Sequence, residues 1–89
     1  MDEQQLRLFR TEVYQKLTQL DKNKELGPRG RKIREELGWT QKFVAELVQD
    51  TKAAYISEWE TGRRTPQGEL AMKYLIVIEA MEEMNAGKR

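Results

Sequence analysis

Apolar residues recur at intervals of three and four positions along most of this sequence, and no segment alternates apolar and polar residues with a period of two. Spacings of three and four place side chains on one face of an α-helix, whereas a half-buried strand requires alternation. A chain of 89 residues forms one small domain, which buries only about 60–65% of its unfolded surface. The sequence therefore predicts an all-α fold with a thin core that a partner chain could partly cover.

The first predicted helix begins at the N-terminus, where Asp2 and Gln5 have the spacing of a capping box. One apolar stripe runs along it, formed by Leu6, Phe9, Val13, Leu17 and Leu20. The polar segment Asp21-Lys22-Asn23-Lys24 interrupts the stripe, and Gly27-Pro28 restarts the chain because proline fits a first helical turn. We therefore divide the chain into an N-terminal amphipathic helix with its linker, residues 1–26, and a second unit, residues 27–89.

The second unit is predicted to contain four more helices, which makes five in all. The first of them runs from about Pro28 to Leu37, buries Ile33 and Leu37, and ends at Gly38 in the left-handed conformation. The next begins after Thr40, whose hydroxyl can cap the first turn. Its predicted buried face consists of Phe43, Val44, Leu47 and Val48.

The last two predicted helices follow polar segments. Thr51 is a candidate cap for a short helix through Glu60, buried through Ile56 and Trp59. Thr65-Pro66 has the form of a cap followed by a first-turn proline and opens a longer helix. The apolar residues on one side of this helix are Leu70, Tyr74, Val77, Ile78, Met81 and Met84.

The composition excludes several classes of protein. The chain has no cysteine and no histidine, which excludes disulfide frameworks, zinc fingers, thiol nucleophiles and histidine-dependent triads. We expect no metal, no cofactor and no enzymatic activity, because no nucleophile–base set or phosphate loop is present. The N-terminus does not resemble a signal peptide, and the longest uncharged apolar run, Tyr74 to Ile78, is too short to cross a membrane. We expect a cytoplasmic protein.

The positive charge is concentrated in the middle of the chain. The net charge is only +1, but residues 28–66 hold eight basic and six acidic residues. Within this segment, two short helices joined by a few residues have the geometry of a helix-turn-helix. Periodicity and charge permit this interpretation without establishing it, because helical bundles of many functions contain such pairs.

Three segments at fixed spacing are more specific: Ile33–Gln41, Ala45–Leu47 and Ile56–Pro66. They contain Gly-x-Thr-Gln beginning at Gly38 and Ser-x-Trp-Glu-x-Gly-x-x-x-Pro beginning at Ser57. This set resembles the phage-repressor-like (Cro/C1, or Xre) helix-turn-helix family over roughly Pro28 to Leu75. The resemblance implies a lambda-repressor-like fold with an added N-terminal helix, and sequence-specific binding of double-stranded DNA by a bacterial or phage transcriptional regulator.

The turn between the two motif helices departs from the family pattern. Most relatives have a glycine there and one residue fewer between Ala45 and Trp59, whereas Gln49-Asp50-Thr51 contains no glycine. The longer turn is similar to that of some bacterial antitoxins. It leaves open which residue begins the second motif helix, and hence the register of base contacts by one position.

The second motif helix is expected to lie in the major groove with its first turn toward the base edges. Inward packing of Ile56 and Trp59 turns other positions of this helix outward. The predicted base-contacting residues are Lys52, Ala53, Ala54, Tyr55 and Glu58. Alanines can contact a thymine methyl group and a glutamate can accept from a cytosine amino group. Since strong bidentate readers are missing from this helix, we expect DNA shape to contribute to discrimination.

Phosphate contacts are expected to orient the domain on the duplex. The predicted phosphate-contacting residues are Gln41, Thr51, Arg63 and Arg64, with Arg29, Arg31 and Lys32 as weaker candidates. The resemblance assigns the glutamine at Gln41 to a phosphate contact that sometimes also braces the recognition helix. It implies that Glu60 is the internal partner of an arginine rather than a base reader.

The helices outside the motif suggest partners. Family members usually bind as twofold dimers on inverted half-sites about 34–36 Å apart, and the chain is interpreted as a homodimeric repressor. The candidate dimer surfaces are the stripe of the first helix and the Met81–Met84 end of the last. An alternative is an antitoxin-type autorepressor or adaptor, in which the first helix binds a toxin or another partner protein. In a third interpretation, the first helix binds no partner and only covers the core of its own chain.

Overall fold

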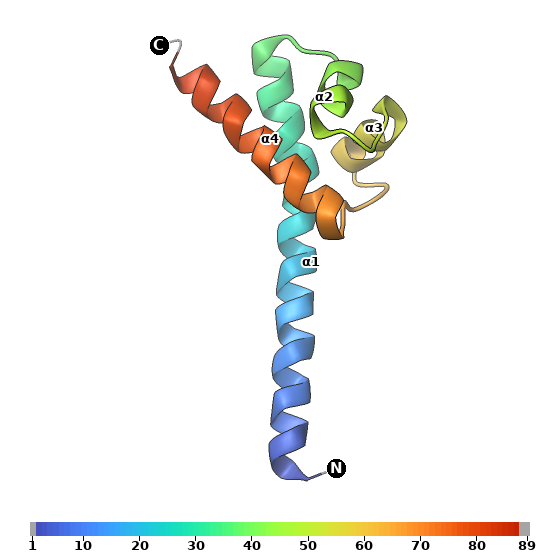
Figure 1. Ribbon diagram of the computed structural model, residues 1–89, viewed down its shortest axis with the longest axis vertical. Helices are drawn as coiled ribbons and strands as arrows, with labels where there is room; N and C mark the ends of the chain where they lie inside the picture. The colour runs from blue at the N-terminus through green and yellow to red at the C-terminus, as the bar shows by residue number, and fades with distance from the viewer. Residues whose placement is uncertain (1, 88–89) are drawn as a thin grey trace.

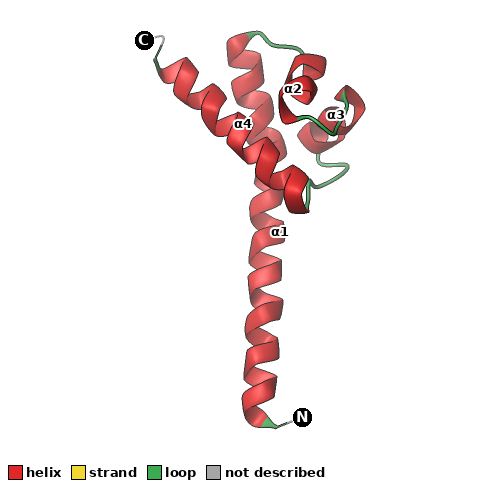
Figure 2. Cartoon of the chain, in the orientation of Figure 1, coloured by secondary structure: helices red, strands yellow, loops and turns green. Residues whose placement is uncertain are grey.

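The computed structural model describes residues 2–87, apart from the side chains of Phe9 and of residues 12–21. The described residues form four helices and no strand: α1 (Glu3–Leu37), α2 (Gln41–Val48), α3 (Ala53–Thr61) and α4 (Gly68–Ala86). α1 packs against α3 and α4, and α2 packs against the same two helices. Figures 1 and 2 show the three shorter helices gathered around the C-terminal half of α1. The predicted all-α fold is confirmed.

α1 is one continuous helix of 35 residues, so the break predicted between two separate helices is wrong. The capping box at its start is confirmed, because the backbone N–H of Gln5 donates to Asp2 Oδ1 over 2.8 Å. Its end at Gly38, with φ of 72°, is confirmed as well. The segment Asp21-Lys22-Asn23-Lys24 and Pro28 both lie inside the helix. All five predicted helical segments are therefore helical, but the first two are joined.

Packing explains why α1 continues through Pro28. A proline inside a helix removes one hydrogen bond at a cost of about 3 kcal/mol. Leu26 and Ile33, on either side of Pro28, are both buried in the core and hold the helix on the body of the protein. Polar residues such as those at 21–24 lower helix propensity only slightly and do not end a helix by themselves. The division at residues 26 and 27 stays a prediction.

Two glycines let α1 approach the other helices closely. A Cβ atom added to Gly27 would overlap the carbonyl oxygen of Trp59 on α3. A Cβ atom added to Gly30 would overlap the hydroxyl group of Tyr74 on α4. Gly27 therefore serves close helix packing, and it does not mark the break that its position beside Pro28 suggested.

The core lies where the four helices meet. Ile56 of α3 and Ile78 of α4 are fully buried, and the rings of Trp59 and Tyr74 contact each other with centroids 5.0 Å apart. The buried apolar residues are Leu26, Ile33, Val44, Ala45, Val48, Ile56, Trp59, Ala71, Tyr74, Ile78 and Met81. Leu37, Leu70 and Val77 are partly buried against them.

Two apolar residues predicted to be buried, Phe43 and Leu47, are exposed, and so is Met84 of the candidate dimer surface. Phe43 and Leu47 on α2 are 41% and 42% exposed, and Met84 on α4 is 43% exposed. α2 is short and uses the face of Val44, Ala45 and Val48 for the core, so residues one position before this face point outward. Phe43 instead packs edge-to-face on Trp39, with ring centroids 4.8 Å apart.

Two predicted helix starts are also wrong. α3 begins at Ala53 after Lys52, not at a Thr51 cap, and Lys52 makes no side-chain cap hydrogen bond. α4 begins at Gly68 after Gln67, two residues beyond Pro66. Pro66 is buried, so it packs against the body in the loop and does not open the helix. The cap at Thr40 is confirmed, since its hydroxyl accepts from the backbone N–H of Phe43 over 3.0 Å.

The N-terminal half of α1 projects from the body (Figure 1). The molecule measures 54 Å along its longest axis and 29 and 19 Å across the others. Leu6 and Leu8 on this arm are exposed. The predicted stripe residues Phe9, Val13, Leu17 and Leu20 have side chains outside the described residues. Burial of that stripe in an interface stays a prediction.

Candidate nucleic-acid interface

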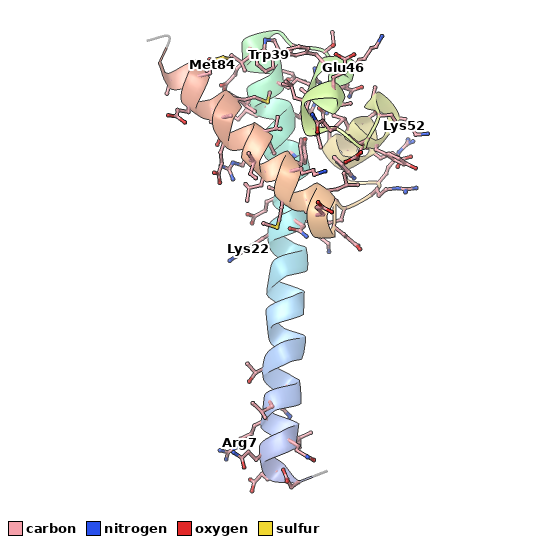
Figure 3. All side chains as sticks on the ribbon, in the orientation of Figure 1. Arg7, Lys22, Trp39, Glu46, Lys52 and Met84 are labelled. Carbon is pink, nitrogen blue, oxygen red and sulfur yellow. The ribbon has the colours of Figure 1, made fainter. Side chains whose placement is uncertain are left out.

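α2, the turn after it and α3 form a helix-turn-helix arrangement. Ile56 and Trp59 anchor α3 to the core, as predicted, and leave the start of the helix at the surface. Lys52 and Ala54 are exposed, while Ala53, Tyr55 and Glu58 are half-buried. Figure 3 shows Lys52 at the outer edge of the molecule, away from α1. Lys52 precedes the first helical residue of α3 and is free of the helical periodicity that turns Ile56 and Trp59 toward the core.

The turn between the motif helices has an uncommon backbone conformation. Gln49 has φ of 65° and ψ of 163°, and Asp50 has φ of 52°. Aspartate tolerates the left-handed region, but the region occupied by Gln49 is essentially restricted to glycine and costs about 1–3 kcal/mol for other residues. The missing glycine of the sequence pattern is thus replaced by a strained glutamine.

Lys73 of α4 ties this turn to the body. Its Nζ donates to Asp50 Oδ2 over 2.7 Å. This hydrogen bond lowers the pKa of Asp50 and raises the pKa of Lys73, and in both residues it is the largest cause of the pKa shift. No sequence motif marks Lys73, because its partner lies 23 residues away and the pairing arises only from the fold.

The buried carboxylate of Glu60 links α1, α2 and α3. Glu60 of α3 accepts hydrogen bonds from Arg34 Nε over 2.7 Å and from Arg34 Nη2 over 3.0 Å. Gln41 Nε2, at the start of α2, donates to the same carboxylate over 3.1 Å. The hydrogen bond with Glu60 is the main reason that the pKa of Arg34 is raised. Arg34 Nη1 also donates to the carbonyl oxygen of Trp39 over 2.8 Å.

This network confirms that Glu60 is the internal partner of an arginine and identifies that arginine as Arg34. Arg34 lies in the basic segment of the sequence, but no local spacing marks it as the partner of Glu60, which lies 26 residues away. The side chain of Gln41 braces α3 through Glu60, so it is the backbone N–H groups at the start of α2 that remain for an anion. A phosphate contact by Gln41 stays a prediction.

A second group of charged residues surrounds the ring of Tyr55 and is called the Tyr55 cluster. It consists of Lys52, Tyr55, Glu58 and Arg64. Arg64 Cζ lies 5.0 Å from the ring centroid and Lys52 Nζ lies 5.3 Å from it. Arg64 Nε forms an ion pair with Glu58 Oε2 over 2.7 Å. The structure thus brings together three predicted base contacts and one predicted phosphate contact.

The other predicted phosphate contacts lie apart from this cluster. Arg63 is exposed in the loop after α3. The hydroxyl oxygen of Thr51 is buried and has no hydrogen-bond partner among the described residues. The roles predicted for Thr51 and Arg63, like those of Lys52, Ala53, Ala54 and Tyr55, stay predictions.

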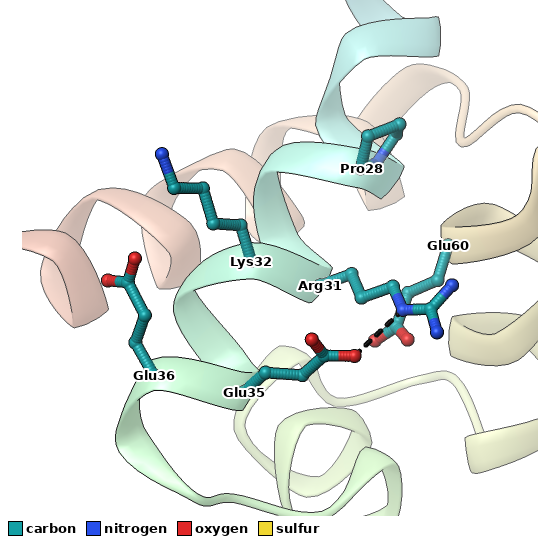
Figure 4. Close-up of a pocket in the computed structure, with 6 residues that line it drawn as sticks. All are labelled: Pro28, Arg31, Lys32, Glu35, Glu36 and Glu60. Atoms are coloured by element: carbon teal, nitrogen blue, oxygen red, sulfur yellow. Dashed lines mark hydrogen bonds and ion pairs between the residues drawn. The ribbon is translucent and has the colours of Figure 1, made fainter.

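The basic residues of α1 that were weaker candidates are largely paired with acids. Arg29 donates to both carboxylate oxygens of Glu82, over 2.9 and 2.6 Å. Arg31 Nε donates to Glu35 over 2.8 Å, and Figure 4 shows this pair in a hollow that Lys32 and Glu36 also line. These hydrogen bonds are the main reason that the pKa values of Glu35 and Glu82 are lowered. The cationic side chains of this surface are therefore mostly neutralised, which makes it a poor anion site.

Residues 31–79 match a family model described as helix-turn-helix, of the Cro/C1 type. The match covers more than half of the chain and includes the C-terminal end of α1, all of α2 and α3, and most of α4. Comparison with curated proteins and with solved structures found no match. Within residues 2–87, no helix has the length and apolar character that a membrane span requires.

Proposed function

The chain belongs to the Cro/C1-type helix-turn-helix family of DNA-binding transcription regulators, and we propose that it binds double-stranded DNA sequence-specifically through α3. One observation carries the proposal: Ile56 and Trp59 fix α3 in the core while its leading turn stays exposed. A helix held in this way can enter the major groove with its first residues toward the base edges.

The predicted base contacts come from the start of α3. Ala54 is exposed and small, which lets the backbone approach the groove and brings a methyl group to a thymine methyl. Lys52 and Tyr55 flank this position, and Ala53 is the neighbouring small residue. Because these side chains include no bidentate base reader, sequence-dependent DNA shape supplies part of the discrimination.

The predicted phosphate contacts lie on both sides of α3. Arg63 and Arg64 follow the helix, and the backbone N–H groups at the start of α2 offer a further donor set at Gln41. Thr51 in the turn is the remaining candidate. Such contacts hold the domain in register on the duplex without carrying sequence information.

A homodimeric repressor on inverted half-sites is the assembly that we propose. The arm of α1 supports it, because it projects from the body with Leu6 and Leu8 exposed, and most of a helix's stability in a protein comes from packing, which a partner would supply (Figure 1). A second copy of the chain doubles the few contacts that one helix-turn-helix makes. Sedimentation of the full chain and of a variant lacking residues 2–20 tests this assignment, and a monomeric full chain would contradict it.

The arm also favours a second candidate, an antitoxin-type autorepressor or adaptor. In that case the arm binds a partner protein and DNA binding is secondary. A partner that co-purifies with the full chain but not with the variant lacking residues 2–20 would support it. A partner retained by the truncated variant would exclude the arm as its binding element.

Selection from a random DNA pool tests the proposed function most directly. We expect an inverted repeat whose half-site centres lie one helical turn, about 34–36 Å, apart. The affinity for the selected duplex should fall steeply with salt, because phosphate contacts release counterions. Selection of no preferred sequence, or an affinity independent of salt, would contradict the proposal.

A further inference from the structure

Glu58 holds Arg64 in two ways. Its carboxylate forms the 2.7 Å ion pair with Arg64 Nε, and its backbone carbonyl accepts from the Arg64 backbone N–H over 3.2 Å. Arg64 lies in the loop after α3, six residues beyond Glu58 in the sequence. These two contacts hold Arg64 beside the C-terminal part of α3.

Tyr55 supports the same guanidinium from another side, with Arg64 Cζ 5.0 Å from its ring centroid. A guanidinium has five N–H donors, more than one carboxylate can accept. Arg64 therefore keeps donors for a DNA phosphate, and its side chain remains more than half exposed at 58%. The carboxylate of Glu58, by contrast, is paired with Arg64 through Oε2, so a base contact by this oxygen would have to break the ion pair.

We propose that Glu58 is a positioning residue: it holds Arg64 against Tyr55 in the orientation that grips a DNA phosphate beside α3, and it reads no base. This assignment rests on the proposed function and replaces the cytosine contact predicted for Glu58 from the sequence. A pre-oriented arginine contributes more to binding than a mobile one, because less side-chain entropy is lost when the phosphate is bound.

Neutralising Glu58 distinguishes the positioning role from simple repulsion between its negative charge and the DNA. Removing a negative charge close to DNA, with nothing else changed, tightens binding to the polyanion. Loss of the positioning carboxylate weakens binding instead. We expect Glu58→Gln to weaken binding about two- to fivefold, the range that an exposed ion pair supports. The slope of log affinity against log salt should become shallower by about one phosphate contact.

The experiment uses the full chain with two probes: a random-sequence 20-base-pair duplex and the duplex selected from the random pool. Positioning predicts the same loss on both. Glu58→Asp keeps the charge but shortens the side chain, so it should also weaken binding on both probes. Glu46→Gln is the matched control, since Glu46 is exposed on α2 (Figure 3) and forms no ion pair among the described residues. It should bind as tightly as the wild type or more tightly.

A double-mutant cycle tests whether Glu58 acts through Arg64. In an Arg64→Ala background, Glu58→Gln should no longer weaken binding. Unchanged circular dichroism and thermal midpoint are expected for each variant, because neither side chain is buried in the core.

Three results would overturn the assignment while leaving the proposed function intact. They are tighter binding by Glu58→Gln, a loss of affinity for the selected duplex but not for the random-sequence duplex, and the same loss with and without Arg64. Failure of the wild-type chain to bind either duplex would overturn both proposals together.

Discussion

At the scale of single residues, the proposed interface depends on a buried carboxylate, that of Glu60. Glu60 lies on α3 but receives hydrogen bonds from α1 and α2, through Arg34 and Gln41. Its side chain is 2% exposed and that of Arg34 is 15% exposed, so the pair is largely removed from water. Such a pair fixes geometry more than it adds free energy, because its attraction is offset by the desolvation of both charges.

Removal of one partner should therefore be costly and removal of both should be mild. Glu60→Ala leaves the Arg34 guanidinium buried without its carboxylate, and we expect the free energy of unfolding to fall by about 3–5 kcal/mol. The double variant Arg34→Met/Glu60→Leu should recover most of that loss. Urea denaturation of the single and double variants measures both values. Equal destabilisation by the single and double variants would show that packing, and not the unpaired charge, causes the loss.

Gln49 offers the opposite case, a residue whose replacement should stabilise the fold. Its φ of 65° and ψ of 163° lie in a region that only glycine enters without strain. We expect Gln49→Gly to raise the free energy of unfolding by about 1 kcal/mol, since relief of strain exceeds the entropy that glycine adds to the unfolded chain. Thermal unfolding checks this, with Ala80→Gly, at an exposed position inside α4, as the control that should destabilise. A destabilised Gln49→Gly variant would contradict the strain argument.

At the scale of helices, α1 depends on the two glycines that face α3 and α4. Gly30→Ala places a methyl group against the hydroxyl and ring of Tyr74, which are buried and cannot move away. We expect a loss of about 1–3 kcal/mol, the usual range for overpacking. The double variant Gly30→Ala/Tyr74→Phe removes the nearest atom and should regain part of it.

Gly27→Ala is the matched comparison. Its methyl group meets a backbone carbonyl, that of Trp59, so no side-chain substitution can relieve it. It should be destabilising in both the wild-type and the Tyr74→Phe backgrounds. Denaturation curves for the four variants decide the matter, and a Gly30→Ala variant as stable as the wild type would refute the close packing of α1 on α4.

The sequence predicted the features that depend on residues close together in the chain. The capping box of Asp2, the end of α1 at Gly38, the cap at Thr40 and the burial of Ile56 and Trp59 follow from residues a few positions apart. The continuity of α1 through Pro28 does not, because it depends on contacts with helices far along the chain. The clamp between Asp50 and Lys73 and the pairing of Glu58 with Arg64 likewise arise only once the helices are packed.

At the scale of the whole molecule, a small helical body carries one long helix that leaves it as an arm. The body contains the network of Glu60 and the exposed start of α3. The arm reaches the opposite end of the molecule along its longest axis (Figure 1). The proposed DNA contacts and the proposed contact with a second protein chain therefore lie on separate surfaces. Substitutions on the arm should change assembly without changing the fold of the body.

The pH dependence of stability should be flat between about pH 5 and pH 10, because the chain has no histidine. Asp50, Glu35 and Glu82 have lowered pKa values in the folded state through their bonds to Lys73, Arg31 and Arg29. Their contributions are present above their unfolded pKa values and are lost as the pH falls through the folded ones, so stability declines below about pH 4.5. Urea midpoints measured from pH 3 to pH 9 check this acid limb.

The loss of stability at alkaline pH should arise from one buried side chain, that of Tyr74. Burial raises the pKa of Tyr74 well above its ordinary value of 10.0. Above about pH 10 the unfolded chain releases the phenolic proton of Tyr74 while the folded chain keeps it, so the free energy of unfolding falls as the pH rises. The Tyr74 hydroxyl has no hydrogen-bond partner among the described residues, so Tyr74→Phe should cost little at pH 7. Urea midpoints of both proteins from pH 8 to pH 11 are the measurement. The fall in stability above pH 10 should be smaller in the phenylalanine variant, and equal falls in both proteins would assign the loss to Lys73, whose pKa is also raised.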